Sequence, residues 1–188
     1  MKKMIVAAAI ACVAAFAQAA TVGWSAGGIG SSFPECAYKF FVIGQNDATI
    51  ADVTKDLNAG KSIDSYAFAS GKTTATGALS QSASAAGAPT LDQGEYTAFI
   101  VLFDSGAPKA GESKYVLISG QSGFTKTIGA STAAVTFTGG NVSSIVSNAD
   151  NWKSFGAPGP GPDPTPEPTS GLLLLVGGAM LALRRKQK

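Results

Sequence analysis

The sequence predicts a mostly-β chain with a single antiparallel β-sandwich or barrel-like domain and one short helix. Three observations support this fold class. Short runs rich in β-branched and aromatic residues recur at fairly even spacing, Gly and Ser residues separate them, and two of the runs are continuously apolar. Short strands separated by turn residues are typical of antiparallel sandwiches and barrels.

The two continuously apolar runs predict a central hairpin. They cover residues 95–103, which end at Asp104-Ser105-Gly106, and residues 114–119. Continuous Ile, Val, Leu and Phe residues suit strands that are covered on both faces. Further strands are predicted over residues 38–43, 62–69, 73–82, 124–128 and 133–138, with Gly139-Gly140 ending the last of them. Residues 142–149 form either a final helical turn or a strand, and Trp152 and Phe155 are expected to close the edge of the core.

One helix is predicted over residues 48–57. Ile50, Val53 and Leu57 recur at helical spacing, and Gly60 follows as a stop signal. Asp47 precedes the run and is a good N-cap residue. We therefore expect Asp47 to cap a short amphipathic helix.

The N-terminus has the three parts of a secretory signal peptide. Met1-Lys2-Lys3 is followed by an apolar run over 5–17 and by Ala17-Gln18-Ala19, an A-x-A exit. We expect cleavage after Ala19. A retained membrane anchor is the alternative, but about 13 apolar residues give a helix of roughly 20 Å, short of the ~30 Å hydrocarbon core. A lipoprotein signal ending at Cys12 is disfavoured because the apolar run continues past that cysteine.

The C-terminus combines a linker, a short apolar segment and a basic end. Residues 158–165 alternate Pro with Gly, Asp and Thr, which predicts an extended polyproline spacer. Pro166-Glu167-Pro168 and a small-residue hinge follow. The apolar segment spans 172–183 and includes Leu172, Leu173, Leu174, Leu175, Val176, Leu181 and Leu183. The tail 184–188 begins with Arg184, Arg185 and Lys186, a positive cluster that is expected to stay cytoplasmic while the preceding chain is translocated.

This order of parts resembles the PEP-CTERM sorting domain over residues 166–188. The resemblance implies processing by an exosortase, passage through the inner membrane of a Gram-negative-type bacterium that makes exopolysaccharide, and transfer to the outer surface or the extracellular matrix. A plain C-terminal transmembrane anchor is the alternative, and the shortness of the apolar segment favours the processed signal. The predicted organisation is a signal peptide at 1–19, an extracytoplasmic domain at 20–157, a linker at 158–165 and a sorting segment at 166–188.

The charge of the central domain argues against nucleic acid as a partner. Residues 20–157 contain eight lysines, ten carboxylates and no arginine, so the positive charge of the whole chain comes from its ends. Phosphate binding needs clustered Lys or Arg, whereas these lysines are scattered. The expected partners are signal peptidase and exosortase as processing enzymes, a membrane passed transiently, and exopolysaccharide as a candidate ligand.

The chain has no histidine, which excludes a Ser-His-Asp triad, a His-assisted cysteine nucleophile and histidine-ligated zinc. Residues 23–27 match the G-x-S-x-G pattern, but Ser25 has no base and no predicted strand before it. Asp47, Asp52, Asp56 and Asp64 lack the alternate-position spacing of an EF-hand, and a solvated helix face explains two of them better. We expect no catalytic residue, no bound metal and no cofactor.

Cys36 is the one cysteine left after signal removal, so no intramolecular disulfide can form. It is either a small buried hydrophobe beside the strand at 38–43, which we favour, or a candidate thiol for reaction or bridging between chains. Asn141-Val142-Ser143 matches a glycosylation sequon.

Five aromatic residues suggest a sugar-stacking platform or, more simply, a core rim. They are Trp24, Tyr66, Tyr96, Tyr115 and Trp152.

Three classes of function stay open on the sequence alone. The first, which we favour, is a non-catalytic structural protein of the cell surface, biofilm or extracellular matrix. The second is a surface carbohydrate-binding module that uses exposed aromatics. The third is a hydrolase with two facing carboxylates.

Overall fold

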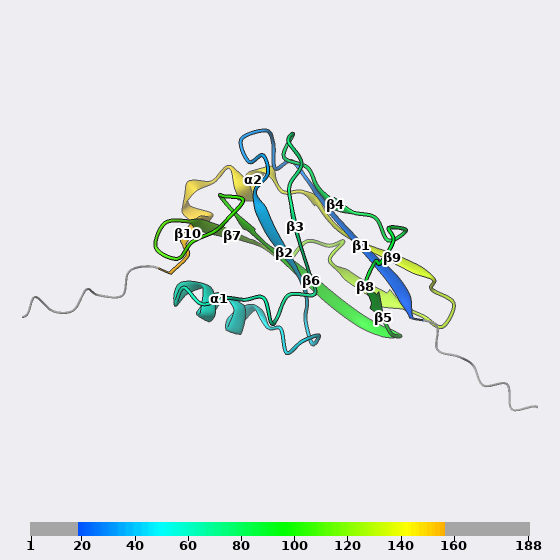
Figure 1. Cartoon of the computed structure of the whole chain (residues 1–188). Helices are drawn as coiled ribbons and strands as arrows, with labels where there is room; N and C mark the ends of the chain where they lie inside the picture. Colours follow the sequence, from blue (N-terminus) through cyan, green and yellow to red (C-terminus); the bar gives the residue numbers. More distant parts are fainter. Residues whose placement is uncertain (1–18, 157–188) are drawn as a thin grey trace, which may run out of the picture.

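The computed structural model describes residues 19–156 of the 188-residue chain (Figure 1). Strands make up 38% and helices 12% of these residues, which confirms that the domain is mostly β. The predictions for the signal peptide including Ala17, the linker, the Pro-Glu-Pro motif, the apolar segment and the basic tail lie outside the described residues. Within residues 19–156, no helix is long and apolar enough to cross a membrane.

The first sheet, sheet A, is built around β1. This strand pairs antiparallel with β4 and β5 along one edge and parallel with β9 along the other. The bounds are Ala20–Gly27 for β1, Leu79–Gln81 for β4, Thr90–Leu91 for β5 and Ala134–Asn141 for β9. The prediction of an antiparallel domain is therefore wrong for the pairing of β1 with β9. These two strands are far apart in the sequence, so no tight turn imposes an antiparallel direction on them.

The second sheet, sheet B, has the strand order β10-β7-β6-β2-β3, and β8 extends it along the first half of β6. The bounds are Ala37–Val42 for β2, Ala69–Lys72 for β3, Gly94–Phe103 for β6, Lys114–Ile118 for β7, Thr125–Ile128 for β8 and Lys153–Ser154 for β10. β6 and β7 are antiparallel neighbours, which confirms the predicted central hairpin. Figure 1 shows sheet B as the middle layer of the molecule, with sheet A above it and α1 below.

β6 is covered on both faces because its alternate side chains enter two separate cores. Ala98, Ile100 and Leu102 belong to the core between the two sheets, which also contains residues of β1 and β9. Phe99, Val101 and Phe103 belong to a second core under the helix. Side chains of a strand point alternately to opposite faces, so a continuous apolar run fills both cores.

Helix α1 (Ile50–Asn58) covers the outer face of sheet B. Val53 and Leu57 are buried against that face, as their helical spacing predicts. The N-cap is Thr49, whose hydroxyl accepts a hydrogen bond from the backbone N–H of Asp52 at 3.0 Å. The prediction that Asp47 caps the helix is wrong, because Asp47 lies two residues earlier in a turn with a φ of 57°.

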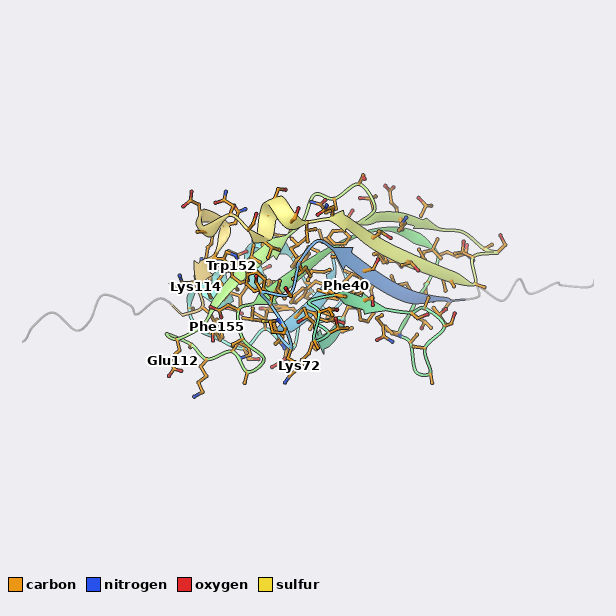
Figure 2. All side chains as sticks on the ribbon, turned by 90° about the horizontal axis from the view of Figure 1, so that it is seen from above. Phe40, Lys72, Glu112, Lys114, Trp152 and Phe155 are labelled. Carbon is orange, nitrogen blue, oxygen red and sulfur yellow. The ribbon has the colours of Figure 1, made fainter. Side chains whose placement is uncertain are left out.

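The core between the sheets is centred on Phe40, which is fully buried. Its ring stacks on Trp24 with the ring centroids 4.7 Å apart, and it also contacts Phe137 at 5.6 Å and Phe68 at 6.2 Å. The indole N–H of Trp24 donates to the Tyr38 hydroxyl at 3.2 Å, so the polar groups of this buried pair are satisfied. Phe40 lies near the middle of the molecule in Figure 2.

One predicted strand is wrong and another is shorter than expected, because side chains bond to nearby backbone. The strand predicted over 62–69 is strand only at Ala69, where β3 begins. Residues 62–68 form turns and irregular structure, and the Ser62 hydroxyl accepts from the N–H of Asp64 at 3.2 Å. Within 73–82 only β4 is extended, and Thr74 closes a turn by accepting from the N–H of Ala78 at 2.9 Å. Such local bonds compete with a strand ladder.

Sequence reasoning missed β1 altogether. Buried Val22, Trp24 and Ala26 recur at every second residue, which is the period of a half-buried strand, but Gly23 between them is buried too and interrupts the alternation. β9 was predicted to stop at Gly139-Gly140 but continues to Asn141, because a bulge opposite β1 accommodates Gly140 at a φ of 63°.

The last segment contains helix α2 (Ser143–Val146), one of the two alternatives for residues 142–149, followed by the 3-10 helix η1 (Ala149–Asn151). Trp152 packs against the core between the sheets and Phe155 lies in the core under α1, as predicted.

We predict that Phe40→Ala lowers the free energy of unfolding by about 3–5 kcal/mol, because it leaves a cavity in contact with three other aromatic rings. Urea denaturation followed by circular dichroism would measure this loss. The matched control is Ile43→Ala just after β2, where the side chain is 37% exposed and the loss should stay below about 1 kcal/mol. Equal losses in the two variants would contradict the assignment of Phe40 to the centre of the core.

Candidate functional site

Sheet A carries no charged side chain. β1, β4, β5 and β9 contain no Asp, Glu, Lys or Arg, and the segments that hold them, 19–34, 73–91 and 127–149, are uncharged throughout. The charged residues of the described part lie on sheet B, on α1 and in the segments that adjoin them. One half of the domain is therefore free of fixed charge, and a ligand bound there gains nothing from ion pairing.

A cavity of about 400 Å³ lies at one end of this uncharged half. Its walls come from the connection between β1 and β2, from α2 and from η1. Phe33 and Trp152 supply aromatic surface, and Ser32, Ser143 and Ser147 supply hydroxyl groups. The volume is in the range of small-molecule sites, which is about 300–1,000 Å³. This cavity is the candidate functional site.

Trp152 is fixed in place by the end of α2. Its indole N–H donates to the carbonyl oxygen of Val146 at 2.8 Å, and the Asn151 side chain donates to the carbonyl oxygen of Ile145 at 2.9 Å. These bonds satisfy carbonyls that the end of a helix leaves without partners. The indole nitrogen is thus used internally, and Trp152 offers the cavity only carbon surface. Figure 2 shows Trp152 beside α2 at one end of the molecule.

Phe33 is fixed from the other side through Thr73. The Thr73 hydroxyl is buried, donates to the carbonyl oxygen of Phe33 at 2.7 Å and accepts from the N–H of Cys36 at 2.9 Å. The ring of Phe33 then stacks on Trp152 with a centroid distance of 5.0 Å and an interplanar angle of 13°. Both rings are half-buried, so part of each remains accessible. The cavity is pre-formed because hydrogen bonds hold the Trp152 indole and the backbone of Phe33 in place.

The sequence pointed to only one of the two aromatic residues of this cavity. Trp152 is among the five candidate aromatics, and Phe33 is not. No motif links the two residues, because their contact depends on how α2 and η1 return to the connection between β1 and β2.

Cys36 is buried, with 4% of its surface exposed, which agrees with the interpretation we favoured from the sequence. Burial raises the pKa of the thiol, and the nearby Asp104 carboxylate raises this pKa further. A thiol reacts as its thiolate, so both effects lower the reactivity of Cys36. The structure therefore gives no support to a reactive thiol or to a bridge between chains.

We predict that Cys36 reacts with a thiol reagent at least about tenfold more slowly in the folded chain than in concentrated guanidinium chloride, because it is buried and protonated. The measurement uses a Cys12→Ser chain, in which Cys36 is the only thiol. A Cys12→Ser, Cys36→Ala, Ser84→Cys chain is the exposed control and should react equally fast in both conditions. Rapid labelling of folded Cys36 would show that it is accessible.

The five candidate aromatics do not form one row. Trp24 and Tyr115 are buried, and the Tyr115 hydroxyl donates to the Asn58 side chain at 2.8 Å. Tyr66 packs against the core under α1, whereas Tyr96 and Trp152 pack against the core between the sheets. A stacking platform made from all five residues is therefore incompatible with their positions on both sides of sheet B.

The acidic residues around α1 are engaged by neighbouring side chains. Asp52 accepts from Thr49, and Asp56 accepts from the Tyr66 hydroxyl at 3.1 Å. Asp64 accepts from Lys39 and from Ser62. Across residues 19–156, no group of three His, Cys, Asp or Glu side chains is arranged to hold a metal ion.

Lys39 lowers the pKa of the Asp64 carboxyl by a hydrogen bond, and Ser62 lowers it further. A carboxyl whose pKa is depressed in the folded state contributes stability above its unfolded pKa, and this contribution is lost as pH falls through the folded pKa. Because the Asp64 side chain is 73% exposed, the contribution to stability is small.

We predict that Lys39→Met raises the pKa of Asp64 toward its ordinary value, since it removes the main hydrogen-bond donor. Carbon-detected NMR of the side-chain carboxyl during an acid titration would measure the shift. Lys61→Met is the matched control: it removes the exposed lysine paired with Asp56 at 3.9 Å and should leave Asp64 unchanged. An unchanged Asp64 titration in Lys39→Met would refute the pairing.

The G-x-S-x-G match and the glycosylation sequon both lie at β-strands of sheet A. Ser25 is inside β1, opposite Ser80 and Thr138, so residues 23–27 do not form the strand-turn-helix elbow of a nucleophilic serine. Asn141 ends β9, and its side-chain oxygen accepts from the N–H of Ser143 at 2.9 Å. Ala19, at the predicted cleavage site, lies directly before β1.

Comparison of the chain with models of protein families, with curated proteins and with solved structures gives no match.

Proposed function

We propose that this chain is an exported structural protein without catalytic activity, which an exosortase sorts to the outer surface or extracellular matrix of a bacterium. The observation that carries the proposal is the order of three parts at the C-terminus: Pro166-Glu167-Pro168, the apolar segment 172–183 and the basic tail 184–188. A signal peptide at 1–19 complements this tail, because the sorting segment acts only on a chain that has entered the export pathway.

The boundaries of the folded domain support this organisation. β1 begins at Ala20, directly after the proposed cleavage site, and β10 ends at Ser154, shortly before the proline-rich linker. Both proposed processing events would thus fall outside the hydrogen-bonded strands. Figure 1 also places the start of β1 and β10 at opposite ends of the domain, so the linker would hold the domain by the end far from the proposed cleavage site.

The domain itself suits a structural role at a surface. Two sheets and α1 bury two cores, so the domain is a stable layered body. Its finer architecture is that of a β-sandwich with one added helix layer and one parallel strand pair. Because sheet A has no charged side chain, its stability should depend little on the ionic strength outside the cell.

We predict that residues 158–188, fused behind a secreted reporter, are cut and that the reporter reaches the cell surface or matrix in a host that has an exosortase. Immunoblots of membrane, periplasmic and extracellular fractions would measure this. The matched control replaces Pro166 and Pro168 with Ala and keeps the apolar segment and basic tail, and it should stay uncut in the membrane.

Two outcomes separate sorting from its alternatives. If the reporter stays uncut in the membrane with both the unmodified and the Pro-to-Ala tail, the segment is a plain anchor. An uncut reporter that is soluble in the periplasm would overturn the proposed sorting altogether.

A further inference from the structure

The cavity lined in part by Phe33 and Trp152 has the chemistry of a site for an uncharged, polyhydroxylated ligand. Its aromatic wall offers carbon surface, since the Trp152 indole N–H is already bound to the carbonyl oxygen of Val146. Its remaining polar groups include the hydroxyls of Ser32, Ser143 and Ser147. A hydroxyl both donates and accepts, as does each hydroxyl of a sugar.

The absence of charge at the cavity narrows the class of ligand. No Asp, Glu, Lys or Arg lines it, and the segments 19–34 and 127–149 that supply most of its wall are uncharged. A carboxylate or phosphate ligand would lose its hydration without gaining a cationic partner. A neutral sugar ring loses less free energy when it leaves water for this cavity. Its apolar face contacts aromatic carbon and its hydroxyl groups bond to the serine hydroxyls.

The two rings are also held in place before any ligand arrives. Thr73 fixes the backbone at Phe33, and the end of α2 fixes Trp152. A rigid site loses little conformational entropy on binding, so weak individual contacts suffice. Within residues 19–156 the hydroxyls of the three serines form no hydrogen bond, since the bond of Ser143 to the Asn141 side chain uses its backbone N–H, so these hydroxyls are available to a ligand.

We propose that this cavity is a subsite for one neutral sugar residue of a polysaccharide, with Phe33 and Trp152 as the stacking surface and the three serines as the hydroxyl partners. The choice of a polymer as the source of the sugar rests on the proposed function, whereas the site itself does not. The subsite differs from the five-residue aromatic platform considered from the sequence, because Trp152 is the only residue common to both.

The test uses the full-length chain in a zwitterionic detergent without a sugar headgroup. Neutral hexasaccharides of β-1,4-linked glucose, mannose and galactose are titrated while tryptophan fluorescence is recorded, with hexagalacturonate as the anionic comparison. We expect at least one neutral hexasaccharide to shift the emission of Trp152 and to bind more tightly than hexagalacturonate. The expected dissociation constant is about millimolar, as for a single shallow subsite.

Ser147→Arg places a long side chain in the cavity without removing any core residue, and we expect it to weaken binding about tenfold or more. The matched control is Ser84→Arg, which adds the same charge at an exposed position of the uncharged half, outside the cavity, and should bind like the unmodified chain. Circular dichroism verifies that both variants are folded.

Three outcomes would overturn the subsite. They are no binding of any neutral hexasaccharide, equal binding of hexagalacturonate, or binding that Ser147→Arg leaves unchanged. Self-association of the chain that Ser147→Arg abolishes, in the absence of sugar binding, would reassign the cavity to a second copy of the chain. The reporter experiment depends only on residues 158–188, so failure of the subsite and failure of the sorting proposal are separate results.

Discussion

The alternation of side chains along β6 is the constraint on which the rest of the domain depends. One set of residues, including Ile100, enters the core shared with sheet A, and the other set, including Val101, enters the core under α1. Sheet A and α1 do not need to contact each other, because each is held by its own face of the same strand. A shift of β6 by one residue would exchange the two sets and disrupt both cores at once.

The parts of the fold that sequence predicted well are those in which a strong local pattern coincides with burial. The apolar run of β6 and the helical spacing of Val53 and Leu57 are examples. β1 has a weaker alternation, because Ala and Gly dilute it and Gly23 is buried out of phase, and β9, with which it pairs over the most residues, lies far along the chain. The parallel pairing of these strands is a tertiary outcome, which no short window of sequence contains.

The candidate site shows the same division. The sequence supplied Trp152 as an aromatic of interest, and it correctly favoured burial of Cys36. Neither composition nor spacing could bring Phe33 to Trp152, because their contact requires a buried threonine on one side and the end of a four-residue helix on the other. The uncharged part of the domain is visible in the sequence only as three separate uncharged segments, and the fold brings them together into one region.

If the chain is exported as proposed, the position of Ala20 constrains the order of events during export. This residue is fully buried as the first residue of β1, opposite Leu91, and the N–H of the next residue donates to the carbonyl oxygen of Ala133 at 3.0 Å. A peptidase needs a locally open chain. Under the proposed route, the leader is therefore removed before β9 joins β1. Because β9 is among the last strands to cross the membrane, passage from N- to C-terminus would leave an interval in which the cut is made on a still unpaired strand.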